Sequence, residues 1–129
     1  MGQQAVQWGT KKGGTRGRYV LSHLFLEHGA DVNAVDNDGD SVLVFAVSSG
    51  NEGVVKRIIE SGANINQKNH MGITPLMVAA NNNQREIVII LLESGAKAID
   101  YDHQGHSVLF YAARTPHAIT PDEVIVMAL

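Results

Sequence analysis

The 129-residue sequence has no cysteine, three prolines and few aromatic residues, namely three Phe, three Tyr and one Trp. The absence of cysteine excludes disulfide bonds and thiolate metal sites, and it fits a reducing compartment, so we expect a cytoplasmic or nuclear location. With few aromatic rings, aliphatic side chains and alanine must fill the core. Such a core favours helices that approach one another closely.

The sequence also lacks any apolar run near the roughly 20 residues that a membrane span needs, so we expect no membrane insertion. Acidic residues are absent from residues 1–18, which hold Lys11, Lys12, Arg16 and Arg18, although the whole chain has a net charge of −3. We expect a flexible basic segment here. Charge-driven binding of nucleic acid or an acidic membrane is an alternative, but the acidic remainder and the absence of interleaved aromatic residues argue against it.

Two series of glycines recur at intervals of 33 residues. The first opens the related stretches "GDSVLVFAV", "GITPLMVAA" and "GHSVLFYAA", and the second lies in "HGADVN", "SGANIN" and "SGAKAI". A period of this length is typical of repeat proteins, in which each unit is one supersecondary motif. The glycines are Gly39, Gly72 and Gly105, followed by Gly29, Gly62 and Gly95.

The residue types within one unit predict a turn and two helices. Thr74 is a suitable N-cap and Pro75 suits the first helical position, with Ser41 and Ser107 in the capping place of the neighbouring units. A second apolar helix follows a short polar break, and a glycine then suits a left-handed C-terminal cap. One unit cannot bury both apolar faces, so the units must stack.

The chain resembles ankyrin-repeat proteins. The resemblance rests on "GITPLMVAA" with "EIVIILLESGA", "GDSVLVFAV" with "GVVKRIIESGANIN", and "YVLSHLFLEHGADVNAVD". It implies an all-α solenoid of stacked helix-turn-helix units with β-hairpin-like finger loops. We expect the repeat domain over residues 19–129, divided into a half repeat 19–35, repeats 36–68 and 69–101, and a degenerate, truncated repeat 102–129 that contains a capping box from Thr120 to Glu123.

Several patterns that suggest chemistry are incomplete. "DNDGD" resembles a calcium loop, but Ala34 and Phe45 fall on two key ligand positions. His70 lies one repeat before His103 and His106, roughly 10 Å away at ordinary helix-packing distances, which is too far to share a metal ion. Asp102, His103 and Ser107 are triad residue types that adjoin in sequence at a turn. We therefore expect no catalytic, cofactor or metal site, and no enzymatic activity.

For this family, the resemblance implies protein binding through the groove formed by finger tips and first helices. We expect Met71 and Ile73 to be exposed at the centre of the interface, and the three finger histidines suggest binding that depends on pH. Some ankyrin repeats are hydroxylated at finger asparagines, and the resemblance makes Asn33 and Asn66 candidate sites for this modification. The partner-binding candidates are Asn37, Asp38, Asp40, Ser48, Ser49, His70, Met71, Ile73, Asn81, Asn82, His103, Gln104, His106, Arg114 and Thr115.

The leading functional hypothesis is a non-catalytic protein–protein interaction module, an adaptor or scaffold. The alternatives are a regulatory or inhibitory subunit of a partner enzyme and a fragment of a larger multi-domain ankyrin-repeat protein. Because terminal repeats need polar outer faces and "VIVMAL" is apolar, self-association through uncapped ends is a further alternative.

Overall fold

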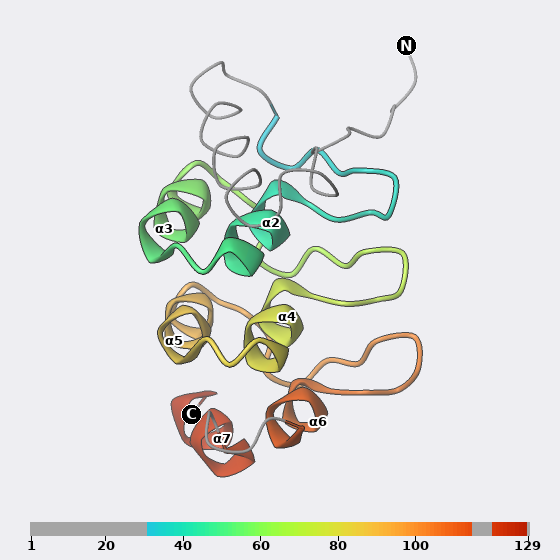
Figure 1. Ribbon diagram of the computed structural model, residues 1–129, viewed down its shortest axis with the longest axis vertical. Coiled ribbons are helices and arrows are strands. Elements are labelled where there is room, and N and C mark those ends of the chain that lie inside the picture. The colour runs from blue at the N-terminus through green and yellow to red at the C-terminus, as the bar shows by residue number, and fades with distance from the viewer. Residues whose placement is uncertain (1–30, 115–119, 129) are drawn as a thin grey trace.

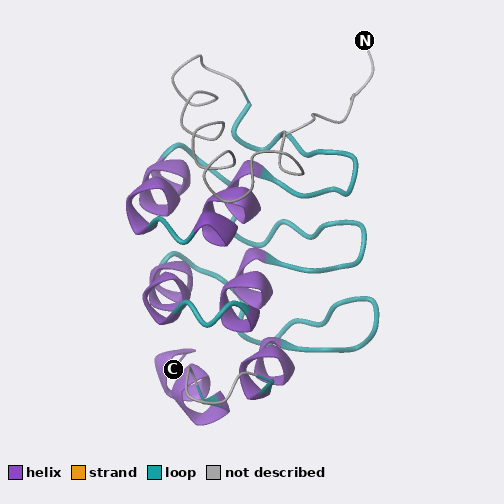
Figure 2. Cartoon of the chain, viewed as in Figure 1, coloured by secondary structure: helices purple, strands orange, loops and turns teal. Residues whose placement is uncertain are grey.

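The computed structural model describes residues 31–114 and 120–128, and these residues form six helices (Figure 1). The first helices of the three units stack in one column and the second helices stack in another. The long loops that lead into the first helices project to one side (Figure 2). The predicted all-α solenoid is therefore confirmed. In chain order the helices are α2 (Val42–Ser49), α3 (Glu52–Glu60), α4 (Pro75–Asn81), α5 (Arg85–Glu93), α6 (Val108–Ala113) and α7 (Pro121–Ala128).

Some predictions fall outside the described residues: the basic segment 1–18, the start of the half repeat at 19–30, and Thr115. The repeat boundaries set out above also remain predictions. Within the described ranges, none of the helices combines the length and apolar character that crossing a bilayer requires.

The projecting loops are called here the first finger (residues 35–41), the second finger (68–74) and the third finger (101–107). Single antiparallel bridges join Val35 to Ser41 and Tyr101 to Ser107. In the second finger, the N–H of Asn69 donates to the carbonyl of Ile73 at 3.0 Å. Each finger is thus a narrow, backbone-closed loop, and the described residues contain no longer strand ladder.

Side-chain caps begin most of the helices as expected. Thr74 Oγ1 accepts from the N–H of Met77, and Ser41 Oγ makes the same kind of bond at the start of α2. At α7, Thr120 and Glu123 exchange the two bonds of a capping box, which confirms that prediction. Ser107 differs from the other predicted caps: it occupies the N-cap of α6, yet its hydroxyl makes no capping bond, so its predicted capping role was wrong.

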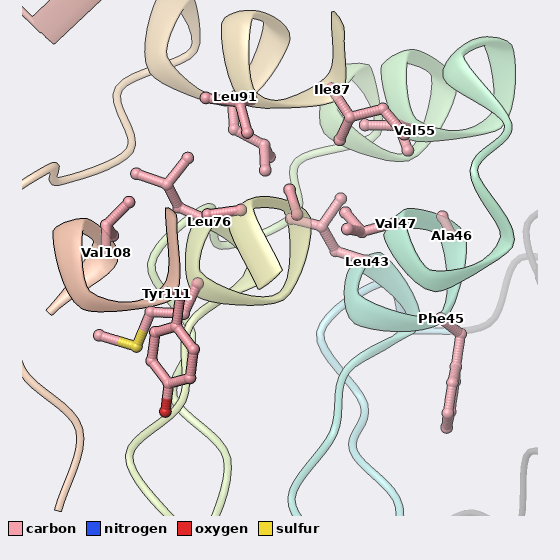
Figure 3. Close-up of a cluster of buried hydrophobic side chains, with 14 of the residues drawn as sticks. Leu43, Phe45, Ala46, Val47, Val55, Leu76, Ile87, Leu91, Val108 and Tyr111 are labelled. Carbon is pink, nitrogen blue, oxygen red and sulfur yellow. The ribbon is translucent and has the colours of Figure 1, made fainter. Parts of the chain in front are cut away.

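The core repeats in the same 33-residue register as the glycines. Leu43 and Leu76 are both buried in the first helices, and Ala46, Ala79 and Ala112 lie within the same stack (Figure 3). The alanines allow the close helix approach predicted from the composition. Fully burying one leucine side chain contributes roughly 1.5–3 kcal/mol. The first helices pack on those of the neighbouring units as well as on the second helix of their own unit, so each unit depends on the next for its stability.

Candidate binding surface

The same side-chain-to-backbone turn shapes each finger. In the first finger, Asp36 Oδ1 accepts from the N–H groups of Asp38 and Asp40, both at 2.9 Å. Asn69 and Asp102 make the equivalent pair of bonds in the second and third fingers. An oxygen at this position satisfies two backbone donors that the tight loop cannot pair otherwise. The finger tips are therefore held in a defined shape.

Neighbouring fingers are also joined to one another. The N–H of His70 donates to the carbonyl of Asp38 at 3.0 Å, and His103 makes the same bond to the second finger. The imidazole of His70 lies against Gly39, where an added Cβ would be 2.7 Å from the ring, and His103 lies in the same way against Gly72. Both glycines have positive φ, so close approach and backbone conformation together require glycine. The fingers form one continuous, fixed row.

The predicted partner-binding residues that the structure describes lie on the fingers and at the C-terminal ends of the first helices, and they differ in exposure. The half-buried ones are Asp40, Ser48, Ser49, Ile73 and His106. The exposed ones are Asn37, Asp38, His70, Met71, Asn81, Asn82, His103, Gln104 and Arg114.

The two apolar candidates in the second finger differ. Met71 is 55% exposed, as expected. Ile73 is half-buried and packs against the hydrophobic core, so the prediction that it is exposed was wrong. The physical reason is local: Asn69 Oδ1 accepts from the N–H of Ile73, and the carbonyl of Ile73 accepts from Asn69, which fixes this residue at the base of the finger.

The three histidines occupy separate environments. His70 and His103 cover glycines of successive fingers, whereas the His106 ring stacks on Phe110. The hydroxyl that reaches Asp102 belongs to Tyr111, so the triad types in "DHQGHS" are not arranged as a triad.

A group of three acids lies in the first finger. Ligand oxygens of Asp36, Asp38 and Asp40 all lie within 4.8 Å of one another. Asp36 already accepts two backbone hydrogen bonds, and Asp40 Oδ1 accepts from the side-chain amide of Asn69 at 3.0 Å. The carboxylates of Asp36 and Asp40 thus hold the finger and its neighbour in place.

An aromatic and charged cluster in the third unit was not foreseen from the sequence. The buried carboxylate of Asp102 accepts a hydrogen bond from the hydroxyl of Tyr111 and lies 3.7 Å from His106 Nδ1. The His106 and Phe110 rings are parallel within 6° with centroids 3.8 Å apart. The guanidinium of Arg114 lies 5.7 Å from the Phe110 centroid and 5.9 Å from that of Tyr111, within cation–π range.

The electrostatics of this cluster favour a charged Asp102 beside a neutral Tyr111. Burial alone raises the pKa of Asp102, but the hydrogen bonds from Tyr111, His106 and Gln104 outweigh it and hold that pKa below the usual 3.8. Burial and the adjacent Asp102 carboxylate raise the pKa of Tyr111 to about 12. The cluster is therefore a fixed carboxylate–phenol pair covered by a cation and two rings.

The sequence signal for this cluster lies in a comparison of the residues that occupy the same position in the three units. Phe110 stands 33 residues after Met77 and 66 after Val44, which are both buried, yet Phe110 is 39% exposed. A large ring at a position where the other units carry an aliphatic side chain indicates a surface feature of the third unit alone.

The predicted hydroxylation sites link successive units. Asn33 Oδ1 accepts from the N–H of Asn64 at 2.7 Å, and its Nδ2 donates to the carbonyl of Gly62 at 3.4 Å. Asn66 makes the corresponding pair of bonds to the following unit. The next equivalent residue is Ile99, which is 79% exposed. These asparagines therefore contribute to the stack as well as being candidates for modification.

The register of helices, fingers and glycines agrees with a comparison against known families. The model of a family described as ankyrin repeats (three copies) matches residues 12–69 and, in an overlapping match, residues 54–120. No curated protein matches the chain significantly. Since the two family matches together extend over most of the sequence, this chain belongs to the ankyrin-repeat family.

Proposed function

We propose that this chain is a non-catalytic protein-interaction module, an adaptor or scaffold, that binds a protein partner through the groove formed by the fingers and the first helices α2, α4 and α6. Ankyrin repeats are generally protein-interaction modules and are typically non-catalytic. The observation that carries the proposal is a row of hydrogen-bonded fingers that exposes Met71 beside polar residues. An exposed apolar side chain with a polar rim is typical of binding patches.

The proposed mechanism is rigid presentation. Each finger is closed internally, and successive fingers are joined by backbone bonds from His70 and His103. A surface that is ordered before binding loses little conformational entropy when the partner docks. Met71 in the second finger and Phe110 on α6 offer apolar contact area, and both are more than one-third exposed. Such anchors supply much of the binding energy in protein interfaces.

A location in the cytoplasm or nucleus belongs to the same proposal, supported by the absence of cysteine.

A regulatory or inhibitory subunit would use the same groove to cover a partner enzyme. Stoichiometric inhibition of one captured enzyme would distinguish that role from scaffolding.

Site-specific photo-crosslinking tests the groove directly. A photoreactive amino acid replaces Met71 in the full chain, and a matched variant carries it at Lys56, which is exposed on the second helix α3. We expect a partner protein in cell lysate to crosslink from position 71 and not from position 56. Equal crosslinking from both positions, or crosslinking from position 56 alone, would show that the groove is not the binding surface.

Hydroxylation of Asn33 and Asn66 remains a separate prediction. Both side chains would have to leave their inter-unit hydrogen bonds to enter an enzyme's active site. Intact-mass analysis after incubation with an asparaginyl hydroxylase should show the added mass of one oxygen atom per modified residue. An unchanged mass for the unfolded as well as the folded chain would exclude these residues as substrates.

A further inference from the structure

Charge changes along the row of units at equivalent positions. At the ends of the first helices, the register places Ser48 in the first unit, Asn81 in the second and Arg114 in the third. The side chains at these positions therefore change from neutral to cationic toward the third unit.

The fingers change in the same direction. The first finger carries Asp38 at its exposed tip, whereas the equivalent residues, Met71 and Gln104, are uncharged. At the finger base, Asp40 of the first unit corresponds to His106 of the third. The acidic end of the row is thus at the first finger, and the basic end is at the third unit.

The charged side chains at the two ends of the row have no partner of opposite charge among the described residues, whereas nearby charged side chains are paired. The side chain of Asp38 is exposed and makes no hydrogen bond or ion pair with the described residues. Other charges are engaged: Lys68 pairs with Asp100 at 2.9 Å, and Asp102 accepts from Tyr111. Within residues 31–114 and 120–128, Arg114 has cation–π contacts but no carboxylate partner.

We infer that the groove is electrically polarised and binds an extended protein segment in one arrangement, with an acidic side chain on Arg114 and a basic side chain over Asp38. The inference rests on the proposed function and names the chemistry of the partner. Two repeat spacings of about 10 Å separate the ends by roughly 20 Å along the stack, and the finger tip and the helix end are also displaced across it (Figure 1). An extended chain advances about 3.3 Å per residue, so the opposite charges in the partner should be at least about six residues apart.

The setting of Arg114 suits it for a carboxylate. Its guanidinium lies over the Phe110 and Tyr111 rings, which limits its side-chain freedom before binding. An arginine that is already oriented loses less entropy when it pairs with a carboxylate. The adjacent Phe110 ring is 39% exposed and offers an apolar contact to the same partner segment.

The probe is a displayed library of random linear peptides of about twelve residues, selected against the complete 129-residue chain. We expect the enriched peptides to carry an acidic and a basic residue at least about six positions apart, in one order along the peptide. Binding of these peptides should weaken in Met71→Asp, because this variant places a charge in the middle of the groove.

Charge-reversal variants with matched controls then test each end. Arg114→Glu should weaken the enriched peptides about fivefold or more, whereas Lys56→Glu makes the same change in net charge on α3 and should have little effect. Asp38→Lys is paired with Glu93→Lys on α5 in the same way. A peptide with its acidic residue replaced by lysine should regain affinity for Arg114→Glu. Circular dichroism checks that each variant is folded, and Arg114→Gln tests the loss of charge alone.

The possible failures are distinguishable. Enriched peptides that lack the charge pattern but lose binding in Met71→Asp would overturn the polarity and leave groove binding in place. Equal effects of Arg114→Glu and Lys56→Glu would overturn it too. No enrichment, or binding that is unchanged by Met71→Asp, would count against both the polarity and the proposed function.

Discussion

Tyr111 donates its hydroxyl hydrogen to the buried carboxylate of Asp102 and thereby joins helix α6 to the third finger. The two residues are nine positions apart, and the finger turn lies between them. Asp102 also accepts from two backbone N–H groups of that turn. One carboxylate therefore sets both the shape of the finger and its attachment to the helix, and it lies 3.7 Å from Nδ1 of His106.

Removing the Tyr111 hydroxyl should destabilise the fold. A hydrogen bond to a charged group contributes about 1.5–3 kcal/mol, and Tyr111→Phe leaves one carboxylate oxygen of Asp102 without this donor. We expect the free energy of unfolding in urea to fall by roughly 2 kcal/mol. The control is Tyr101→Phe, since Tyr101 is 56% exposed, and it should change stability by a few tenths of a kcal/mol at most. Equal effects of the two substitutions would show that the Asp102 contact does not stabilise the fold.

Lowering the pH should reduce the stability of the third unit by protonating Asp102. The pKa of this carboxyl is lower in the folded chain than the usual 3.8, so its charged form favours folding. That contribution is present above about pH 4 and is lost as pH falls through the lowered folded-state pKa. Asp102→Asn should remove this part of the pH dependence and keep the turn, because Asn69 makes the same turn in the second finger. Urea titrations between about pH 6 and pH 3 test this, and a loss of stability as steep as in the original chain would contradict it.

Most of the architecture could be predicted from the sequence because it depends on local chemistry repeated in register. Glycine at Gly39 and Gly72 follows from positive φ, and the Thr74 cap follows from the free N–H groups of the first turn. The repetition at 33 residues then fixes which faces must pack, since no unit buries its apolar residues alone.

The candidate site was less predictable because it depends on the directions in which side chains point. Ile73 was expected at the surface, but its backbone is held by Asn69 and its side chain packs inward. The cluster around Arg114 combines residues from a finger, a helix and a helix end. Their types are visible in the sequence, whereas the ring stacking and the Tyr111 bond depend on tertiary packing.

The asparagine bridges should contribute to coupling between units. Asn66→Ala removes two hydrogen bonds to the following unit, which should cost roughly 1–2 kcal/mol and lower the cooperativity of unfolding. Ile99→Ala is the matched control at the equivalent position, where the side chain is 79% exposed. Urea denaturation with native-state hydrogen exchange measures both effects. If Asn66→Ala left the exchange protection of the second unit, which contains Gly95 and Lys97, unchanged, the bridge would have no role in coupling.

The start of helix α5 offers a stabilising substitution. Gln84 occupies its N-cap but makes no capping bond, and its buried Oε1 has no hydrogen-bond partner among the residues that the structure describes. The equivalent residue 33 positions earlier, Asn51, caps α3 by accepting from the N–H of Val54 at 3.0 Å. Asparagine is one methylene shorter, and that length places its oxygen within reach of the free N–H groups of the first turn.

We therefore expect Gln84→Asn to raise the free energy of unfolding by about 0.5–1 kcal/mol and the reverse change, Asn51→Gln, to lower it by about 1 kcal/mol. The pair is matched because the two sites are equivalent and the two substitutions are opposite. Thermal and urea unfolding of both variants measure the change. Opposite signs would show that side-chain reach determines capping at this turn, whereas destabilisation by both would mean that the Gln84 side chain has a packing role that asparagine cannot fill.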